Sequence, residues 1–565
     1  MFKRARSTSP YILKEEQTDE DYSYNCYVWR NIKGIDYSVN PEMYIFYDVD
    51  PTKCAVHKLG STAFVVNGAL FSRGTDNPEL MEILEDKRDW EICGKGNAIG
   101  ISNGKVAAGS ISTLDVSTTS WGALGSQSAS VISCPDRTSS NYNMYLIDTN
   151  GHLVRRTYSA GYSVIDSTHT WVDVIGEYCN YTSSSTKYIR FPLALDNNGK
   201  LYSINNTTLT MYNIDEPVVY ISGGLEQSGS SDYRRPFVIT DSGKAYVITN
   251  PSANDFVYIS EVCGSTKKIL GQCYGSNLTT LTSWQTPVLT ESGQLYRGYY
   301  LKGTPIAHAT NADGTPLHEV IGKIVDICGS NWKSGDAYNK YLVVYAATED
   351  NKLYVIQQGD TGSVWWQMKA TKVLDFDGEV VNMQGRCEGN YCYCMMVTRV
   401  PKGYRALKCI NPKGAITSSS GGGGWTLYDK DELYRALSAE TITDGYPRCQ
   451  HSTIGKYSHF KTPKKGIIKG YHTTIWYDGS AYERICNNWI LTAYDNEEDM
   501  KAHTNGTIIS TGTWSGRAKG RQQYIDLYNN EYSSQYYTLQ LVNNFNKGSY
   551  CSMGSTKFYM LEDEE

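Results

Sequence analysis

One short pattern of apolar and polar residues recurs along most of the chain. In "LALDNNGKLYSINN" (Leu193 to Asn206) apolar residues lead into a polar turn that ends in Asn-Gly, and a second short run follows. Apolar residues at consecutive positions are typical of a strand buried on both faces, and a tight turn joins such a strand to an antiparallel neighbour. The pattern therefore predicts a β-hairpin.

The same hairpin returns at intervals of about 36 to 58 residues. Asn351 takes the place of the turn glycine in one copy, and asparagine is the non-glycine residue that best tolerates a left-handed backbone. We therefore expect positive φ at this position in each copy. Aligned on that position, the copies fall at Gly68, Gly104, Gly151, Gly199, Gly243, Gly293, Asn351 and Gly403.

A second recurrent element precedes most of the hairpins: an apolar trio that runs into Gly or Ser, as in "WVDVIGEYCN" and "KIVDICGSN". A unit of about 45 residues made of short strands cannot bury its own faces, and radial stacking of such sheets gives a β-propeller. A β-sandwich or a β-solenoid is the alternative, although solenoid repeats are shorter, at about 20 to 30 residues. The repeat favours a propeller.

These units resemble the β-propeller family named for the regulator of chromosome condensation. The resemblance lies in an apolar trio ending in Gly, followed by Thr-x-x-Gly-x-Leu-Tyr as in "LTESGQLY", and it covers about residues 43–412. It implies seven blades around an axis, with the first and last units closing one blade; eight hairpins leave eight blades as the alternative. Only the fold is implied, because propellers host unrelated functions.

A different pattern follows residues 413–425, whose Ser and Gly content predicts a flexible linker. Alternation in "QYIDL" and "YTLQL" indicates half-buried strands of an antiparallel sandwich. The segments "NNWILTAYDNEED", "YIDLYNNEYSSQYYTLQL" and "GSYCSMGSTKFYMLE" resemble the galactose-binding-like, or discoidin-type, jelly roll found at the ends of many bacteriophage tail and fibre proteins.

The predicted organisation is all-β: an N-terminal arm over residues 1–42, a seven-bladed (alternatively eight-bladed) β-propeller over 43–412, the linker, and a C-terminal β-sandwich jelly roll over 426–565. Two short stretches have helical spacing instead, Asn77 to Trp90 and Tyr428 to Leu437.

Composition excludes several classes of function. The net charge is −6, from 53 basic and 59 acidic residues without a basic stripe, which argues against nucleic-acid binding. The sequence contains no apolar window of about 18 residues, so we expect no membrane insertion. The N-terminus lacks the apolar core of a secretory signal. The 15 cysteines, an odd and scattered number, do not resemble a disulfide framework. We expect buried thiols in a chain that folds in a reducing cytoplasm.

The sequence lacks the motifs of common enzymes, including the Walker loop, HExxH and the Gly-x-Ser-x-Gly elbow. We therefore expect no catalytic residues, no cofactor and no metal. The acidic stretches Asp375 to Glu379 and Asp495 to Met500 are better explained as solvated turns than as calcium loops. Cys392 and Cys394, two apart in a strand-like run, are expected to be a buried pair on one face.

The jelly-roll resemblance implies that a ligand meets the loops at one end of the sandwich. Suitable side chains there are Trp514 and Arg517, together with His503 and Asn505 just before them. Aromatic faces stack on sugar rings, and arginine donates planar hydrogen bonds. The alternative is that Trp514 packs against its own sandwich.

Together these features predict a non-enzymatic virion protein of the bacteriophage tail or fibre apparatus, assembled in the host cytoplasm and oligomeric within the particle. Its expected partners are other virion proteins and a host-surface glycan or receptor, bound through propeller loops and the jelly roll. The alternatives are a purely structural tail or head decoration protein, a polysaccharide depolymerase and, more distantly, a cellular regulator of a small GTPase.

Overall fold

The structure is a computed structural model, and nearly all of its regular structure is antiparallel β-sheet. This confirms the all-β prediction. The three α-helices of the described residues have five or six residues each, and no described helix is long and apolar enough to cross a membrane. The residues described are 22–32, 42–56, 63–66, 69–72, 90–92, 97–102, 105–110, 131–132, 142–157, 161–175, 178–183, 186–190, 192–222, 233–235, 237–250, 255–258, 265–270, 273–275, 285–299, 308–332, 341–358, 368–388, 391–401, 408–411, 415–429, 432–437, 448–451, 454–474, 486–513, 522–527, 529–544, 551–554 and 556–563.

The first part of the chain, the repeat region, contains short strands and two short helical turns. In chain order they are β1 (Tyr22–Ile32), β2 (Glu42–Phe46), η1 (Pro51–Lys53), β3 (Ala55–Val56), β4 (Ala63–Val66), β5 (Ala69–Ser72), β6 (Trp90–Ile92), β7 (Asn97–Ser102), β8 (Lys105–Ser110), β9 (Val131–Ile132), β10 (Tyr142–Ile147), β11 (Leu153–Thr157), β12 (Gly161–Asp166), β13 (Trp171–Ile175), β14 (Tyr178–Ser183), β15 (Thr186–Arg190), β16 (Leu193–Asp196), β17 (Leu201–Asn205), β18 (Thr208–Met211), β19 (Val218–Ser222), β20 (Tyr233–Arg235), β21 (Phe237–Thr240), β22 (Ala245–Asn250), β23 (Asp255–Tyr258), β24 (Thr266–Ile269), β25 (Cys273–Gly275), β26 (Gln285–Thr290), β27 (Leu295–Tyr299), α1 (Leu317–Ile321), β28 (Ile324–Trp332), β29 (Tyr341–Thr348), β30 (Lys352–Gln358), β31 (Met368–Asp375), β32 (Glu379–Glu388) and β33 (Tyr391–Pro401).

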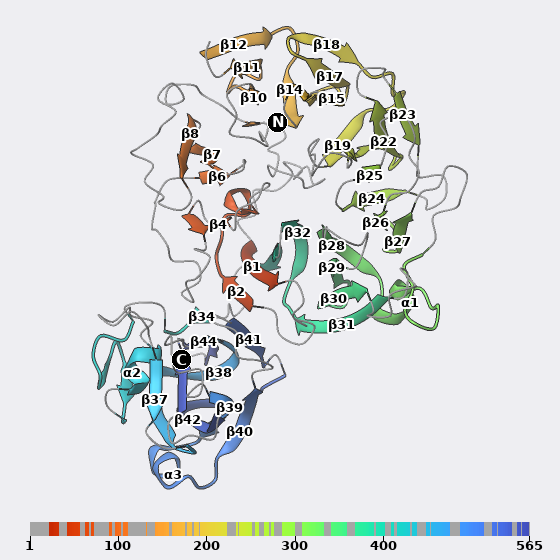
Figure 1. Cartoon of the computed structure of the whole chain (residues 1–565). Helices are drawn as coiled ribbons and strands as arrows, with labels where there is room; N and C mark the ends of the chain where they lie inside the picture. Colours follow the sequence, from red (N-terminus) through yellow and green to blue (C-terminus); the bar gives the residue numbers. More distant parts are fainter. Residues whose placement is uncertain are drawn as a thin grey trace.

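These strands form consecutive small sheets that follow one another in chain order through the upper part of the molecule in Figure 1. Central strands β16 and β21 are buried on both faces, as the hairpin pattern predicted. Among the described residues, the sheets of three or more strands in this region are β2-β1-β33-β32, β3-β4-β5, β6-β7-β8, β12-β11-β10-β14-β15 with β9, β13-β16-β17-β18, β19-β21-β22-β23, β24-β26-β27 and β28-β29-β30-β31.

The ends of the repeat region meet in one sheet, but not as predicted. Strand β1, which lies in the expected N-terminal arm, pairs along its whole length with β33, from Tyr22 opposite Pro401 to Ile32 opposite Tyr391. It occupies the side of β33 where the sequence predicted the return strand of a hairpin at Gly403, a turn outside the described residues. The expected sharing of one blade by the first and last hairpins is therefore wrong, because β4 and β5 belong to a separate sheet with β3.

The turn position of the hairpins has the predicted left-handed backbone. Its φ is 82° at Gly151, 77° at Gly199, 80° at Gly243, 83° at Gly293 and 60° at Asn351. This confirms the expectation in each of the five turns that the structure describes; the turns at Gly68 and Gly104 lie outside them.

Four of these turns also touch the first strand of the next sheet along the chain, and the fifth, at Asn351, touches the residue after β31. The carbonyl of Gly199 accepts a hydrogen bond from the Val218 amide at 2.8 Å, and the other four turns make the same bond to the strand or turn that follows. A Cβ on Gly199 would lie 2.6 Å from Pro217 Cβ, and one on Gly243 would lie 2.1 Å from Ser265 Oγ. At Gly199 the close atoms include the Pro217 backbone, so glycine is required there for the approach of the two sheets and is also favoured by φ.

A buried ion pair links three successive sheets. Lys268 on β24 donates from Nζ to Asp326 Oδ1 on β28 at 2.9 Å and to the Met383 carbonyl on β32 at 2.5 Å. Asp326 Oδ2 in turn accepts the Met383 amide at 2.9 Å. Burial raises the pKa of Tyr220 on β19, and the negative charges of Asp326 and of Asp173 on β13 raise it further. Side-chain and backbone groups of five sheets therefore lie near one another around this ion pair.

The C-terminal domain is a second set of antiparallel strands with its own core. Its elements are β34 (Lys408–Cys409), β35 (Gly421–Gly422), β36 (Trp425–Leu427), α2 (Glu432–Leu437), β37 (Arg448–His451), β38 (Tyr457–Thr474), β39 (Cys486–Tyr494), α3 (Glu497–Ala502), β40 (Thr507–Thr513), β41 (Gln522–Asp526), β42 (Ser533–Asn544), β43 (Cys551–Gly554) and β44 (Thr556–Glu562).

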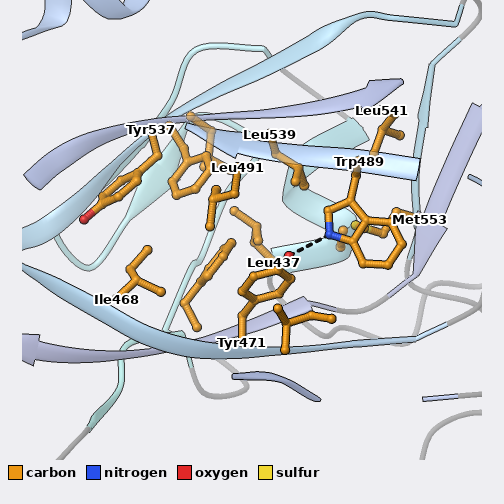
Figure 2. Packing of buried hydrophobic residues seen from close by; sticks show 14 of the residues in the cluster. Leu437, Ile468, Tyr471, Trp489, Leu491, Tyr537, Leu539, Leu541 and Met553 are labelled. Carbon is orange, nitrogen blue, oxygen red and sulfur yellow. Dashed lines mark hydrogen bonds between the residues drawn. The ribbon is translucent and has the colours of Figure 1, made fainter. Parts of the chain in front are cut away.

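The long strand β38 folds this domain into two layers. Its first half pairs with β42, from Tyr457 to Lys461, and its second half pairs with β44 and β41. Apolar side chains fill the space between the layers (Figure 2). Within that core Trp489 Nε1 donates to Tyr471 Oη at 2.7 Å, so this buried indole has its polar atom satisfied.

The Gly/Ser stretch expected as a linker is part of this domain. Gly421 to Gly424 all have positive φ, and a Cβ on Gly421 would lie 2.0 Å from the Trp425 carbonyl oxygen. Trp425 itself is buried in the domain core. The glycines thus build a tight turn into β36, so composition alone gave a wrong prediction of flexibility.

The domain boundary also lies earlier than residue 413. Buried Asn411 donates from Nδ2 to the carbonyls of Leu437 and Thr556, and its Oδ1 accepts the Phe558 amide. The two parts of the chain are in contact, because Tyr559 of β44 is buried in a core cluster of the repeat region, 6.0 Å from Tyr47 between ring centroids.

Candidate functional site

The candidate site begins with the alternation of residues along β38. Tyr457, His459 and Lys461 lie on one face of the strand and are partly exposed, whereas Ser458 and Phe460 are buried on the other. Because side chains of a strand alternate between faces, these three polar and aromatic groups are neighbours on the outer face of the domain. The end of α3 and the residues after β36 approach the same face.

His459 is held by a carboxylate. Its Nδ1 lies 2.7 Å from Asp429 Oδ2, and its backbone amide donates to the same oxygen. Leu427 of β36 pairs with Phe460 of β38, and this pairing brings Asp429, two residues after Leu427, beside His459. A carboxylate only accepts, so a neutral His459 donates from Nδ1 and leaves Nε2 as an acceptor.

His503 completes this chain of hydrogen bonds. Its Nε2 lies 2.7 Å from Nε2 of His459, which allows one proton between the two rings. The rings are nearly parallel, with an interplanar angle of 8°. With both rings neutral, His503 donates to His459 and His459 donates to Asp429.

A capped helical turn presents His503. Asn496 caps α3 by accepting the Asp499 amide at 2.8 Å, and His503 ends the helix in the left-handed conformation with φ 54°. Asn505, also left-handed, donates from Nδ2 to Asp499 Oδ1 at 2.9 Å. The α3 turn is thus tied together by its own side chains.

Aromatic rings surround the histidines. Tyr457 stacks on His503 with 3.8 Å between ring centroids. Lys501 Nζ lies 4.9 Å from the centroid of the Tyr428 ring, and Lys461 Nζ lies 5.4 Å from that of Tyr536. We call this surface the histidine–tyrosine patch; its members are Tyr428, Asp429, Tyr457, His459, Lys461, Lys501, His503 and Tyr536.

Two pKa values in the patch depart from their usual range. Partial burial lowers the pKa of His503, and charge repulsion from the neighbouring His459 lowers it further, so the neutral ring is favoured. Burial and a hydrogen bond to the Glu497 carboxylate raise the pKa of Tyr428, which therefore stays a hydrogen-bond donor. The patch therefore favours a neutral imidazole at His503 and a neutral phenol at Tyr428.

The structure describes two of the four binding residues predicted from sequence. His503 lies in the patch, whereas the amide of Asn505 is used to hold the α3 turn. Trp514 and Arg517 lie outside the described residues. Sequence reasoning missed His459, although the alternation in "YSHFK" would have placed it on the polar face of its strand.

The acidic stretch after β39 has a structural role in the described residues. Asn496 begins α3, and Asp499 accepts from the side chains of Thr504 and Asn505. No group of three or more metal-ligating side chains suited to a metal ion occurs among the residues that the structure describes.

No known family model matches the sequence, and no curated protein matches it. Solved structures similar to part of the chain include a family 32 carbohydrate-binding module of Clostridium perfringens NanJ in complex with galactose, at 9% identity over 24% of this chain and 91% of that one, with a TM-score of 0.19. The module of Streptococcus pneumoniae EndoD gives 12% identity, 27% and 99% coverage, and a TM-score of 0.20. The family 32 module of AlyQ in complex with 4,5-unsaturated mannuronic acid is 15% identical over 25% of this chain and 94% of that one, with a TM-score of 0.18.

Proposed function

We propose that this chain is a non-enzymatic virion protein of the bacteriophage tail or fibre apparatus that binds a host-surface glycan. In this proposal the repeat region is a β-propeller scaffold, and the C-terminal domain is a jelly roll that contacts the glycan through the histidine–tyrosine patch. Other virion proteins would hold the chain in the particle.

The propeller proposal is supported by the contacts between sheets. Four of the five described hairpin turns bond to the first strand of the next sheet, which sets one sheet beside the next in chain order. Groups of five sheets, from the Asp173 carboxylate to the Met383 backbone, lie near one another around the buried Lys268–Asp326 pair. Convergence of successive sheets on a common point is what radial stacking requires. The described sheets favour eight blades over seven, with β1 completing the last one.

The observation that carries the glycan proposal is the stack of Tyr457 on His503, joined by hydrogen bonds to His459 and Asp429. A sugar ring presents an apolar C–H face and a rim of hydroxyl groups. An aromatic face covers the former, and a fixed series of donors and acceptors matches the latter. The patch supplies both on an exposed helix end.

The place in a virion is proposed from the resemblance of the C-terminal motifs to phage jelly rolls. A chain that repeats one scaffold unit and varies the loops between the units suits a structural protein that also recognises a partner. The repeated units form the scaffold, and recognition depends on the variable loops. Assembly in the host cytoplasm and oligomerisation within the particle belong to the same proposal.

The test is a glycan array carrying bacterial surface polysaccharides and their fragments, probed with the full-length chain. Wild-type protein is expected to bind at least one glycan, and Tyr457→Ala and His503→Ala are expected to lose that signal. Glu498→Gln, at an exposed position of α3 outside the patch, is the matched control and should bind like wild type. Absence of binding to the whole array would sink the recognition proposal, and shortening of a bound polysaccharide would replace it with a depolymerase.

A further inference from the structure

Six of the cysteines lie in three buried pairs. In each pair one thiol is within hydrogen-bonding reach of the other, and all six are free thiols at most 5% exposed. The members of each pair also share one hydrophobic core cluster. The pairs are Cys26 with Cys54, Cys328 with Cys394, and Cys486 with Cys551.

The first pair joins the N-terminal strand to the segment after it. Cys26 lies on β1 and faces the cluster that contains Cys54, Val49 and Val66. Cys54 Sγ donates to the carbonyl of Asp50 at 3.3 Å, so its sulfur is left to accept from Cys26. Strand β1 pairs with β33 and β2 in one sheet, and Cys54 directly precedes β3 of the sheet β3-β4-β5. A disulfide between Cys26 and Cys54 would therefore link these two sheets.

The second pair bridges two sheets. Cys328 lies on β28 and Cys394 on β33, where Cys394 pairs across the ladder with Gly385 of β32. A Cβ on Gly385 would lie 3.0 Å from Cys394 Sγ and 2.4 Å from the Gly329 nitrogen. The glycine at 385 therefore lets the two sheets approach closely beside the pair.

The third pair lies in the C-terminal domain. Cys486 Sγ donates to the carbonyl of Asn488 at 2.9 Å, and Cys551 Sγ donates to that of Asn543 at 3.3 Å. The pair joins β39 to β43, two strands that no direct ladder connects. In all three places the two thiols come from segments that no pairing between the described strands connects directly.

We propose that these three pairs are disulfide sites, reduced while the chain folds in a reducing compartment and bonded when it meets an oxidising one. Two of the three bonds would fix the sheet in which the ends of the repeat region meet. The oxidant is a small-molecule disulfide such as oxidised glutathione. One cysteine thiolate attacks it and forms a mixed disulfide, which releases one thiol; the second cysteine attacks the protein sulfur and releases the other thiol.

Burial sets the rate of this reaction. Burial raises the pKa of Cys26, Cys394 and Cys486, so little thiolate is present in the folded chain. Exchange is therefore expected to be slow in the native protein and fast when the chain refolds in the presence of the oxidant.

The experiment uses the reduced full-length chain in two arms: the native protein kept with oxidised glutathione, and the urea-unfolded protein diluted into a glutathione buffer. Peptide mapping without reduction should find the three linked peptide pairs, each lighter by about 2 Da than its separate peptides, first in the refolding arm. Cys26→Ser and Cys328→Ser should each remove one link and leave the other two. Linked peptides with other partners, or thiols that all remain alkylatable in both arms, would overturn the proposal.

Discussion

Alanine at Gly199 should destabilise the repeat region by more than its backbone conformation alone explains. With φ of 77°, Gly199 lies in the left-handed region, where a side chain costs about 1–2 kcal/mol. The new Cβ would also lie 2.6 Å from Pro217 Cβ and 2.8 Å from Pro217 Cα. A proline backbone cannot move aside as a flexible side chain does, and such overpacking adds about 1–3 kcal/mol.

Gly314 is the matched control for Gly199→Ala. Its φ is 92°, and a Cβ there meets nothing within 4 Å. Gly314→Ala therefore carries the backbone cost without the contact. The difference between the two variants, about 1–3 kcal/mol, measures the packing of one sheet against the next.

Urea denaturation of the full-length variants, followed by far-ultraviolet circular dichroism, gives the loss in free energy of unfolding. Hydrogen exchange adds a local readout, because the Val218 amide that donates to the Gly199 carbonyl should exchange faster in Gly199→Ala. Equal losses for Gly199→Ala and Gly314→Ala would refute the contact between turn and next sheet.

Three further changes test other parts of the structure. Lys268→Met leaves Asp326 buried without its partner and should lower the free energy of unfolding by about 3–5 kcal/mol in urea denaturation; a loss under 1 kcal/mol would contradict the buried pair. Asn496→Ala removes the cap of α3 and should cost about 1 kcal/mol by the same assay, whereas no loss would mean that the turn does not need it. The folded-state pKa of His503 lies below its ordinary value of 6.5, so the unfolded chain takes up the proton first. Stability should therefore fall as the pH drops from about 6.5 towards that lowered pKa, and the melting temperature of His503→Gln should vary less over this window.

Local patterns in the sequence predicted the hairpins and the conformation of their turns. Asn351 in a glycine position was enough to infer positive φ, because the preference is a property of one residue. The second requirement on Gly199 could not be inferred, since Pro217 approaches it only after the next sheet has packed. The pairing of β1 with β33 was missed for the same reason: it joins residues far apart in the chain.

The candidate site was only partly accessible from sequence. The α3 turn and His503 follow local rules, because capping side chains and left-handed residues lie within a few positions of one another. The partner of His503 comes from β38, and Asp429 comes from the turn after β36. No spacing in the sequence brings these three segments together; the long strand β38 does so by pairing with β36 on one side and β42 on the other.

The central claim is that the histidine–tyrosine patch binds a glycan, and biolayer interferometry tests it most directly. Purified host-surface polysaccharide would be immobilised and titrated with full-length wild type, Tyr457→Ala and Glu498→Gln. The account predicts saturable binding by wild type and Glu498→Gln, and at least about tenfold weaker binding by Tyr457→Ala, equivalent to about 1.4 kcal/mol. Equal affinity of wild type and Tyr457→Ala, or no binding by wild type, would contradict it.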